Sequence, residues 1–191
     1  MEFDSKEGIP VVNSVRILLV GDVSGSLNRI HQLLSESDLA SCYLNCVTTS
    51  IEIANRLREN SHDVCILDSI ELKVGDFMAQ AKSFGCSMPV IVVTSDSGVE
   101  VLDAIHAGVA DCLLRDRLTI SLLEQSICRV IQETCLALDR LENERRYSGL
   151  IENAKDILYT HDLQGNYKSA NKAAEGLTGY MQEELMRMNA D

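Results

Sequence analysis

The stretch Val64-Cys-Ile-Leu-Asp-Ser69 decides the fold predicted for this chain, because an apolar run leads directly to a carboxylate, Asp68. A continuous apolar run of this kind is typical of a strand that is covered on both faces, as in a parallel sheet. Two other runs have the same form, Ile17–Val20 before Gly21-Asp22 and Val90–Val93 before Thr94-Ser95. Ligands of open α/β sheets gather beyond the carboxyl ends of the strands, so we expect these polar groups to meet at one edge.

Five strand-like segments alternate with helical patterns along the chain. The predicted strands are Val15–Val20, Ser41–Val47, Asp63–Asp68, a strand opened by Pro89, and Asp111–Leu114. Ser24 is placed to cap the helix after the first strand, Thr49-Ser-Ile-Glu52 fits a capping box, and Gly108 suits the left-handed position past a helix end. Strands and helices in this alternation predict a doubly wound, five-stranded parallel sheet.

Charge and composition limit the function classes. The net charge of −12 argues against nucleic acid and against an anionic membrane surface, since both attract basic proteins. No apolar run approaches the roughly 20 residues that cross a bilayer. Residues 1–14 carry no signal-peptide pattern and are expected to be a flexible arm. We therefore expect a cytoplasmic protein.

The seven cysteines form no Cys-x-x-Cys pair, so neither zinc nor a disulfide framework is supported. Cys46, Cys65 and Cys112 lie in strand-like runs, and Cys42 shares a strand face with Cys46. Buried free cysteine behaves as a small apolar residue, and core packing is the predicted role.

From Thr119 the pattern becomes a single long helix. Its apolar stripe has steps of three and four residues: Ile120, Leu123, Ile127, Val130, Thr134, Ala137 and Leu141. We expect the helix to close the sheet domain, 15–131, and to continue as a connector, 132–147. The stripe is compatible with a homodimeric coiled coil and with a single solvated helix.

The last part, 148–191, predicts a small α+β segment. Asp156–Asp162, a turn at Gly165 and a returning strand from Tyr167 suggest a hairpin, and Asn171 can cap a short helix that Gly179 closes. So few large apolar groups cannot build much of a core, which indicates part of a larger domain.

The predicted sheet edge gathers Asp22, Asp68, Thr94 and Arg115. Carboxylates favour Mg²⁺, and a metal, a cationic side chain and a hydroxyl together suit phosphoryl transfer to a carboxylate. Acids and hydroxyls that only cap helices and turns explain the same pattern equally well.

Residues 15–131 resemble a response-regulator receiver domain, a flavodoxin-like phosphoacceptor module of two-component signalling. The matching pieces are Ile17–Asp22, Asp63–Asp68, Pro89–Ser95 and Ala107–Arg115. The resemblance implies that Asp68 accepts the phosphoryl group. It also implies that Asp22 and the backbone carbonyl of Ile70 join Asp68 in holding Mg²⁺, and that the Thr94 hydroxyl and Arg115 contact the phosphoryl group.

The chain departs from the receiver pattern at several positions. Gly21 stands where receivers have a first acid, Arg115 replaces a lysine, and Cys112 replaces a common aromatic residue. Asp116 replaces a proline, and the loop 70–76 lacks the usual Met-Pro. A pseudo-receiver that acts as a phosphorylation-independent dimerisation or interaction module is therefore the alternative function.

Residues 148–191 resemble the start of a PAS domain, through Asp156–Asn166 and Asn171–Tyr180. The predicted function is a phosphorelay receiver, phosphorylated by a histidine kinase or phosphotransfer protein, that signals through the connector helix to the PAS region. The chain itself is not predicted to be an enzyme, although this arrangement occurs in larger histidine kinases and cyclic-dinucleotide enzymes. A nucleotide-binding enzyme is disfavoured, because Gly21-x-x-x-Gly25 lacks the three-glycine spacing.

Overall fold

The computed structural model describes residues 14–21, 26–37, 42–68, 73–95 and 98–189 of the 191-residue chain. The predicted arm before Ser14, the cap Ser24 and the site positions Asp22 and Ile70 lie outside these ranges.

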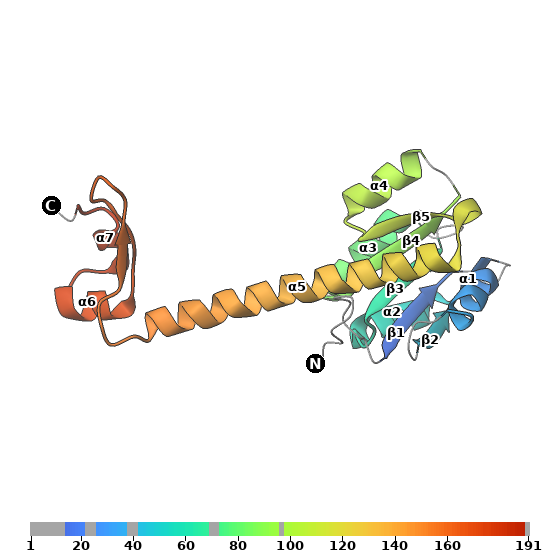
Figure 1. The fold of residues 1–191 in the computed structure, drawn as a ribbon, viewed down its shortest axis with the longest axis horizontal. Coiled ribbons are helices and arrows are strands. Elements are labelled where there is room, and N and C mark those ends of the chain that lie inside the picture. Colours follow the sequence, from blue (N-terminus) through green and yellow to red (C-terminus); the bar gives the residue numbers. More distant parts are fainter. Residues whose placement is uncertain (1–13, 22–25, 38–41, 69–72, 96–97, 190–191) are drawn as a thin grey trace. The chain divides into compact units, whose positions relative to one another are not determined.

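The first unit of the structure is built on a five-stranded sheet in which every neighbouring pair is parallel (Figure 1). Its strands are β1 (Val15–Val20), β2 (Cys42–Val47), β3 (Val64–Asp68), β4 (Val90–Thr94) and β5 (Asp111–Leu114). The order β2-β1-β3-β4-β5 places β3 at the centre. This arrangement confirms the predicted doubly wound, flavodoxin-like sheet.

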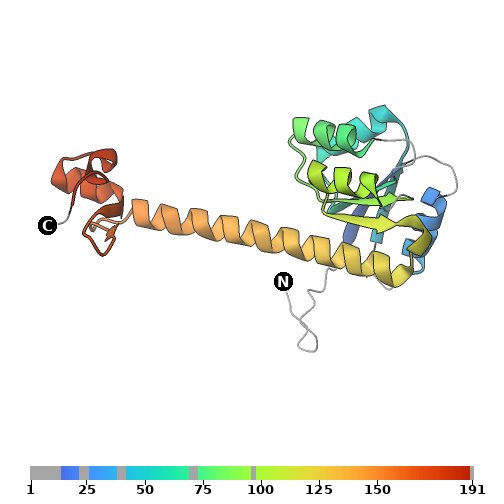
Figure 2. The same cartoon turned by 90° about the horizontal axis from the view of Figure 1, so that it is seen from above.

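Helices cover both faces of this sheet (Figures 1 and 2). One face is covered by α1 (Ser26–Ser35) and by the first turns of α5 (Ile120–Glu152). The other face carries α2 (Ser50–Glu59), α3 (Val74–Ser83) and α4 (Val99–Ala107). Because both faces are covered, the central strands need apolar side chains at every position, which explains their unbroken runs.

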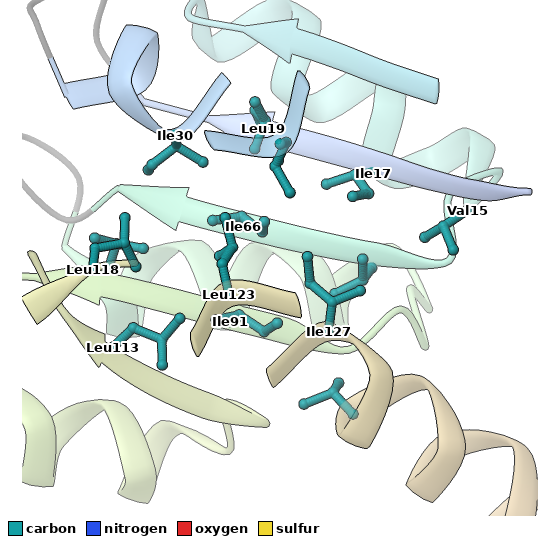
Figure 3. Packing of buried hydrophobic residues seen from close by; sticks show 14 of the residues in the cluster. Val15, Ile17, Leu19, Ile30, Ile66, Ile91, Leu113, Leu118, Leu123 and Ile127 are labelled. Carbon is teal, nitrogen blue, oxygen red and sulfur yellow. The ribbon is translucent and has the colours of Figure 1, made fainter. Parts of the chain in front are cut away.

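Successive residues of each strand contribute to two separate cores, since side chains alternate across a sheet. Ile17 and Leu19 of β1 pack on the α1 and α5 side, where Leu123 and Ile127 meet them (Figure 3). Leu18 and Val20 pack on the α2 and α3 side. Thr49 caps α2 as predicted: its hydroxyl accepts the Glu52 amide hydrogen at 3.3 Å. The Glu52 carboxylate accepts from the Thr49 hydroxyl at 2.9 Å, in place of the Thr49 backbone amide that completes a capping box.

The cysteines are all free, but their surroundings differ from the prediction in one case. Cys65 is buried on β3, and burial raises the pKa of its thiol. Cys46 is exposed, so its predicted role in the core is wrong. Cys46 lies on β2, which is an edge strand with one neighbouring strand, whereas β3 lies at the centre of the sheet between two strands.

The helix α5 has 33 residues and ends at Glu152, beyond the predicted end near Tyr147. Its buried residues all belong to the first turns: Leu123, Ser126, Ile127, Val130 and Ile131. The chain divides into two compact units, 1–135 and 136–191. The boundaries expected at 131 and 147 stay predictions. Within the described residues, no helix is both long enough and apolar enough to span a membrane.

The second unit contains an antiparallel pair, β6 (Tyr159–His161) and β7 (Tyr167–Ala170), and two short helices, α6 (Lys172–Thr178) and α7 (Gln182–Leu185). Asn171 precedes α6 as predicted, but its side chain makes no capping bond to that helix. Instead it is 0% exposed, accepts the Leu158 amide hydrogen at 3.0 Å, and donates to the carbonyl oxygens of Ile151 and Asp156. The side chain of Asn171 therefore fixes the end of α5 against the hairpin.

Candidate functional site

The carboxyl ends of β3, β4 and β5 bring three of the predicted site residues to one edge of the sheet. Asp68 is the last residue of β3, and Thr94 is the last residue of β4. Arg115 begins a short 3₁₀ turn, η1 (Arg115–Arg117), directly after β5. The register Asp68↔Val93 and Thr94↔Leu114 aligns these ends, because parallel strands all run in the same direction.

Asp68 and Arg115 form an ion pair at this edge. The Nη2 group of Arg115 donates a hydrogen bond to Oδ1 of Asp68. The Asp68 side chain is 2% exposed and that of Arg115 is 17% exposed. A carboxylate this deeply buried stays charged only if hydrogen bonds or an opposite charge offset its lost hydration. The Arg115 guanidinium supplies both.

The guanidinium of Arg115 has donor capacity to spare. Its Nε is buried, and among the described residues it meets no hydrogen-bond acceptor. The planar fork of an arginine suits an anion with several oxygens, since adjacent N–H groups can donate in parallel. An anion bound beside Asp68 would therefore find donors on the same side chain that holds the carboxylate.

Thr94 is 1% exposed, and its hydroxyl already has an acceptor. It donates to Oε2 of Glu100 at 2.6 Å, a length typical of a hydrogen bond from a hydroxyl to a carboxylate. Glu100 lies in the first turn of α4. Sequence reasoning missed this contact, and the available signal was an acid six residues after Thr94, in the first turn of a predicted helix.

Gly21 follows β1 and approaches Asp68 closely. A Cβ atom added at Gly21 would lie 2.8 Å from the Cβ of Asp68 and 3.0 Å from Cδ1 of Leu27. Real Cβ atoms essentially never approach so closely, so a side chain at this position requires the backbone or Leu27 to shift. The backbone at Gly21 therefore leaves no space for the side chain of an acid at this position.

The described residues supply one of the three expected Mg²⁺ contacts. The carboxylate of Asp68 is a hard oxygen ligand of the kind that Mg²⁺ prefers. Asp22 and the Ile70 carbonyl lie outside the described ranges. Within those ranges, no group of three acidic, histidine or cysteine side chains could hold a metal ion. The donor chemistry fits Mg²⁺ at Asp68, and the remaining contacts stay predictions.

A second network, at the first residue of β5, fixes α5 to the sheet. Asp111 accepts hydrogen bonds from the Ser126 hydroxyl and from the Arg129 guanidinium.

Cys112, which stands at the common aromatic position, is half-buried and packs against the α2 and α3 core. Burial raises the pKa of its thiol, so Cys112 acts here as an apolar side chain.

His62 lies at the opposite, amino-terminal end of β3 and does not belong to this site. It is buried, and its Nε2 lies 2.8 Å from Nδ2 of Asn45. Burial lowers the pKa of His62, and the charges of Arg56 and Arg16 lower it further. The pKa of the buried ring is thus lowered at the amino-terminal end of β3, away from the candidate site.

The sequence matches no protein-family model and no curated protein. Solved structures do resemble it. A response regulator receiver domain from Clostridium thermocellum is 25% identical, with a TM-score of 0.55 over 64% of this chain and 98% of that one. A signal receiver domain from Vibrio parahaemolyticus is 19% identical, with a TM-score of 0.56 over 68% and 98%.

A third similar structure is the receiver domain of a sensor histidine kinase from Pseudomonas aeruginosa, which has a magnesium ion coordinated in its active-site cleft. It is 18% identical, with a TM-score of 0.53 over 62% of this chain and 98% of that one. These likenesses show that the five-stranded unit has the receiver fold.

Proposed function

We propose that residues 15–131 form a phosphoacceptor receiver module whose acceptor is Asp68. The observation that carries this proposal is the buried carboxylate of Asp68 at the end of the central strand, paired with the Arg115 guanidinium. In the proposed reaction, a carboxylate oxygen attacks the phosphorus of a phosphohistidine. The bond from phosphorus to imidazole nitrogen breaks, an acyl phosphate forms, and the imidazole takes up a proton.

Each neighbouring group has a role in this proposal. Arg115 offsets the negative charge of the phosphoryl oxygens, and its buried Nε is a donor for one of them. Thr94 would donate its hydroxyl hydrogen to another. Asp22, Asp68 and the Ile70 carbonyl would hold Mg²⁺, which neutralises phosphoryl charge when bound.

The proposed partner is a histidine kinase or a phosphotransfer protein, and the proposed location is the cytoplasm. The helix α5 continues from the sheet unit into the second unit, 136–191. It would carry the state of Asp68 to a PAS region, whose beginning we assign to 148–191. Pairing of the exposed Leu138 and Leu141 with a second copy of α5 would give a homodimer.

The test is phosphorylation of the full chain by acetyl phosphate with Mg²⁺, followed by intact-mass spectrometry. We expect one added phosphate in the wild type and none in Asp68→Asn. Asp76→Asn is the matched control, because Asp76 is an exposed acid in the first turn of α3 and should not change the result. A phosphate that persists in Asp68→Asn would refute the assignment.

The second candidate function is a pseudo-receiver that works without phosphorylation, as a dimerisation or interaction module. One observation favours it: the backbone at Gly21 approaches Asp68 too closely for a second acid at that position. It predicts the same oligomeric state for wild type and Asp68→Asn, with or without Mg²⁺, in analytical ultracentrifugation. A change of that state on phosphorylation would exclude this candidate.

A further inference from the structure

Glu100 makes a contact that the proposed function does not explain. Its carboxylate extends from an exposed position in the first turn of α4 to the buried end of β4, where Oε2 lies 2.6 Å from the Thr94 hydroxyl oxygen. The contact crosses from one element to the next at the candidate site.

A hydroxyl group has one hydrogen to donate. The Thr94 hydroxyl donates that hydrogen to Glu100, so it cannot donate it at the same moment to a phosphoryl group on Asp68. A phosphoryl group also brings between one and two negative charges, which repel the Glu100 carboxylate. The two arrangements of the Thr94 hydroxyl therefore exclude each other.

The two ends of α4 are held differently. At its carboxyl end, Lys82 of α3 donates to the carbonyl oxygen of Ala107 at 3.1 Å, and Gly108 closes the helix in a left-handed conformation. At its amino end, the Glu100 carboxylate binds Thr94. Loss of the contact to Thr94 would weaken the attachment of the first turn of α4, while the last turn keeps its contact to α3.

The exposed face of α4 is apolar enough to report such a movement. Leu102 is 58% exposed and Ile105 is 57% exposed, and they lie three residues apart on the helix. A tilt of α4 would change how these two side chains are presented to a partner.

We propose that Glu100 is a positioning residue that competes with the phosphoryl group for the Thr94 hydroxyl and so couples Asp68 to the position of α4. The proposal rests on the proposed phosphorylation of Asp68. Before phosphorylation, Glu100 holds Thr94 and the first turn of α4. After it, Thr94 donates to the phosphoryl group, Glu100 is released and α4 moves.

The first arm of the test measures the steady-state fraction of phosphorylated chain at a fixed, sub-saturating concentration of acetyl phosphate with Mg²⁺. Glu100→Gln keeps the shape of the side chain but is a weaker acceptor, so we expect the ratio of phosphorylated to free chain to rise about fivefold. Asp103→Asn removes the same charge one turn further along α4 and should leave the ratio unchanged. In a Thr94→Ala background, Glu100→Gln should raise the ratio by clearly less, because only the relief of charge repulsion remains.

The second arm needs no phosphorylation. Hydrogen exchange followed by mass spectrometry should show faster exchange in the first turn of α4 in Glu100→Gln and in Thr94→Ala, and no further increase in the double variant. Additive increases, or none, would overturn the anchoring by Glu100.

The two arms distinguish the two ideas. If neither wild type nor Glu100→Gln takes up phosphate, the proposed function fails, and the exchange arm still decides whether Glu100 anchors α4. If both take up phosphate equally, the competition is refuted while the acceptor role of Asp68 stands.

Discussion

Replacement of Arg115 by methionine tests the buried ion pair most directly. The variant keeps a side chain of similar length but removes the charge that pairs with Asp68, whose side chain is 2% exposed. Removal of one partner from a fully buried pair costs about 3–5 kcal/mol. Because the Arg115 side chain is 17% exposed and water can partly replace it, we expect a loss of about 2–3 kcal/mol in the free energy of unfolding.

The assay is urea denaturation of the full chain, followed by far-ultraviolet circular dichroism. Arg117→Met is the matched control, because Arg117 lies in the same 3₁₀ turn but is exposed, and its loss should change stability by less than about 0.5 kcal/mol. The double variant Asp68→Asn/Arg115→Met should recover part of the loss, since the neutral amide costs less to bury. Equal losses for Arg115→Met and Arg117→Met would refute the reasoning, as would a double variant less stable than Arg115→Met.

Three other predictions follow from the packing. Gly21→Ala should destabilise the sheet unit by about 1–3 kcal/mol in urea unfolding, whereas Gly75→Ala, which meets open space on α3, should not. His62 has a lowered pKa in the folded protein, so stability should fall as the pH drops below about 6.5, because the unfolded state binds the proton more readily there. His62→Gln should flatten that fall in urea titrations from pH 7 to pH 5, and a slope like that of wild type would contradict it. Asn171→Ala loses three hydrogen bonds and should cost roughly 2–4 kcal/mol of local stability, read from faster hydrogen exchange at the Leu158 amide.

Much of the sheet unit could be predicted from local patterns. The unbroken apolar runs that end at Val20, Asp68 and Thr94 identified buried parallel strands, because a strand covered on both faces is apolar at consecutive positions. The same runs placed Asp68 and Thr94 at the ends of neighbouring strands, as the structure has them. Short-range signals such as Thr49 and Gly108 were also correct, since each depends on bonds within a few residues.

Predictions failed where an outcome depends on distant residues. Cys46 lies in a strand-like run but is exposed, because strand order makes β2 an edge strand. Asn171 looked like a helix cap, yet its amide bonds to Ile151 and Asp156, and α5 continues to Glu152. No local pattern contains these partners.

The sequence by itself determined the sheet, its helices and the carboxylate that ends the central strand, because periodicity and strand length are local properties of the chain. Only the tertiary structure decided what surrounds that carboxylate. It brings the Arg115 guanidinium onto Asp68, the Gly21 backbone against it, and Glu100 onto the Thr94 hydroxyl. These contacts join residues far apart in the chain, or across a loop, and they exist because the parallel strands end at one edge. The chemistry of Asp68 is thus set by three-dimensional neighbours that its own strand does not specify.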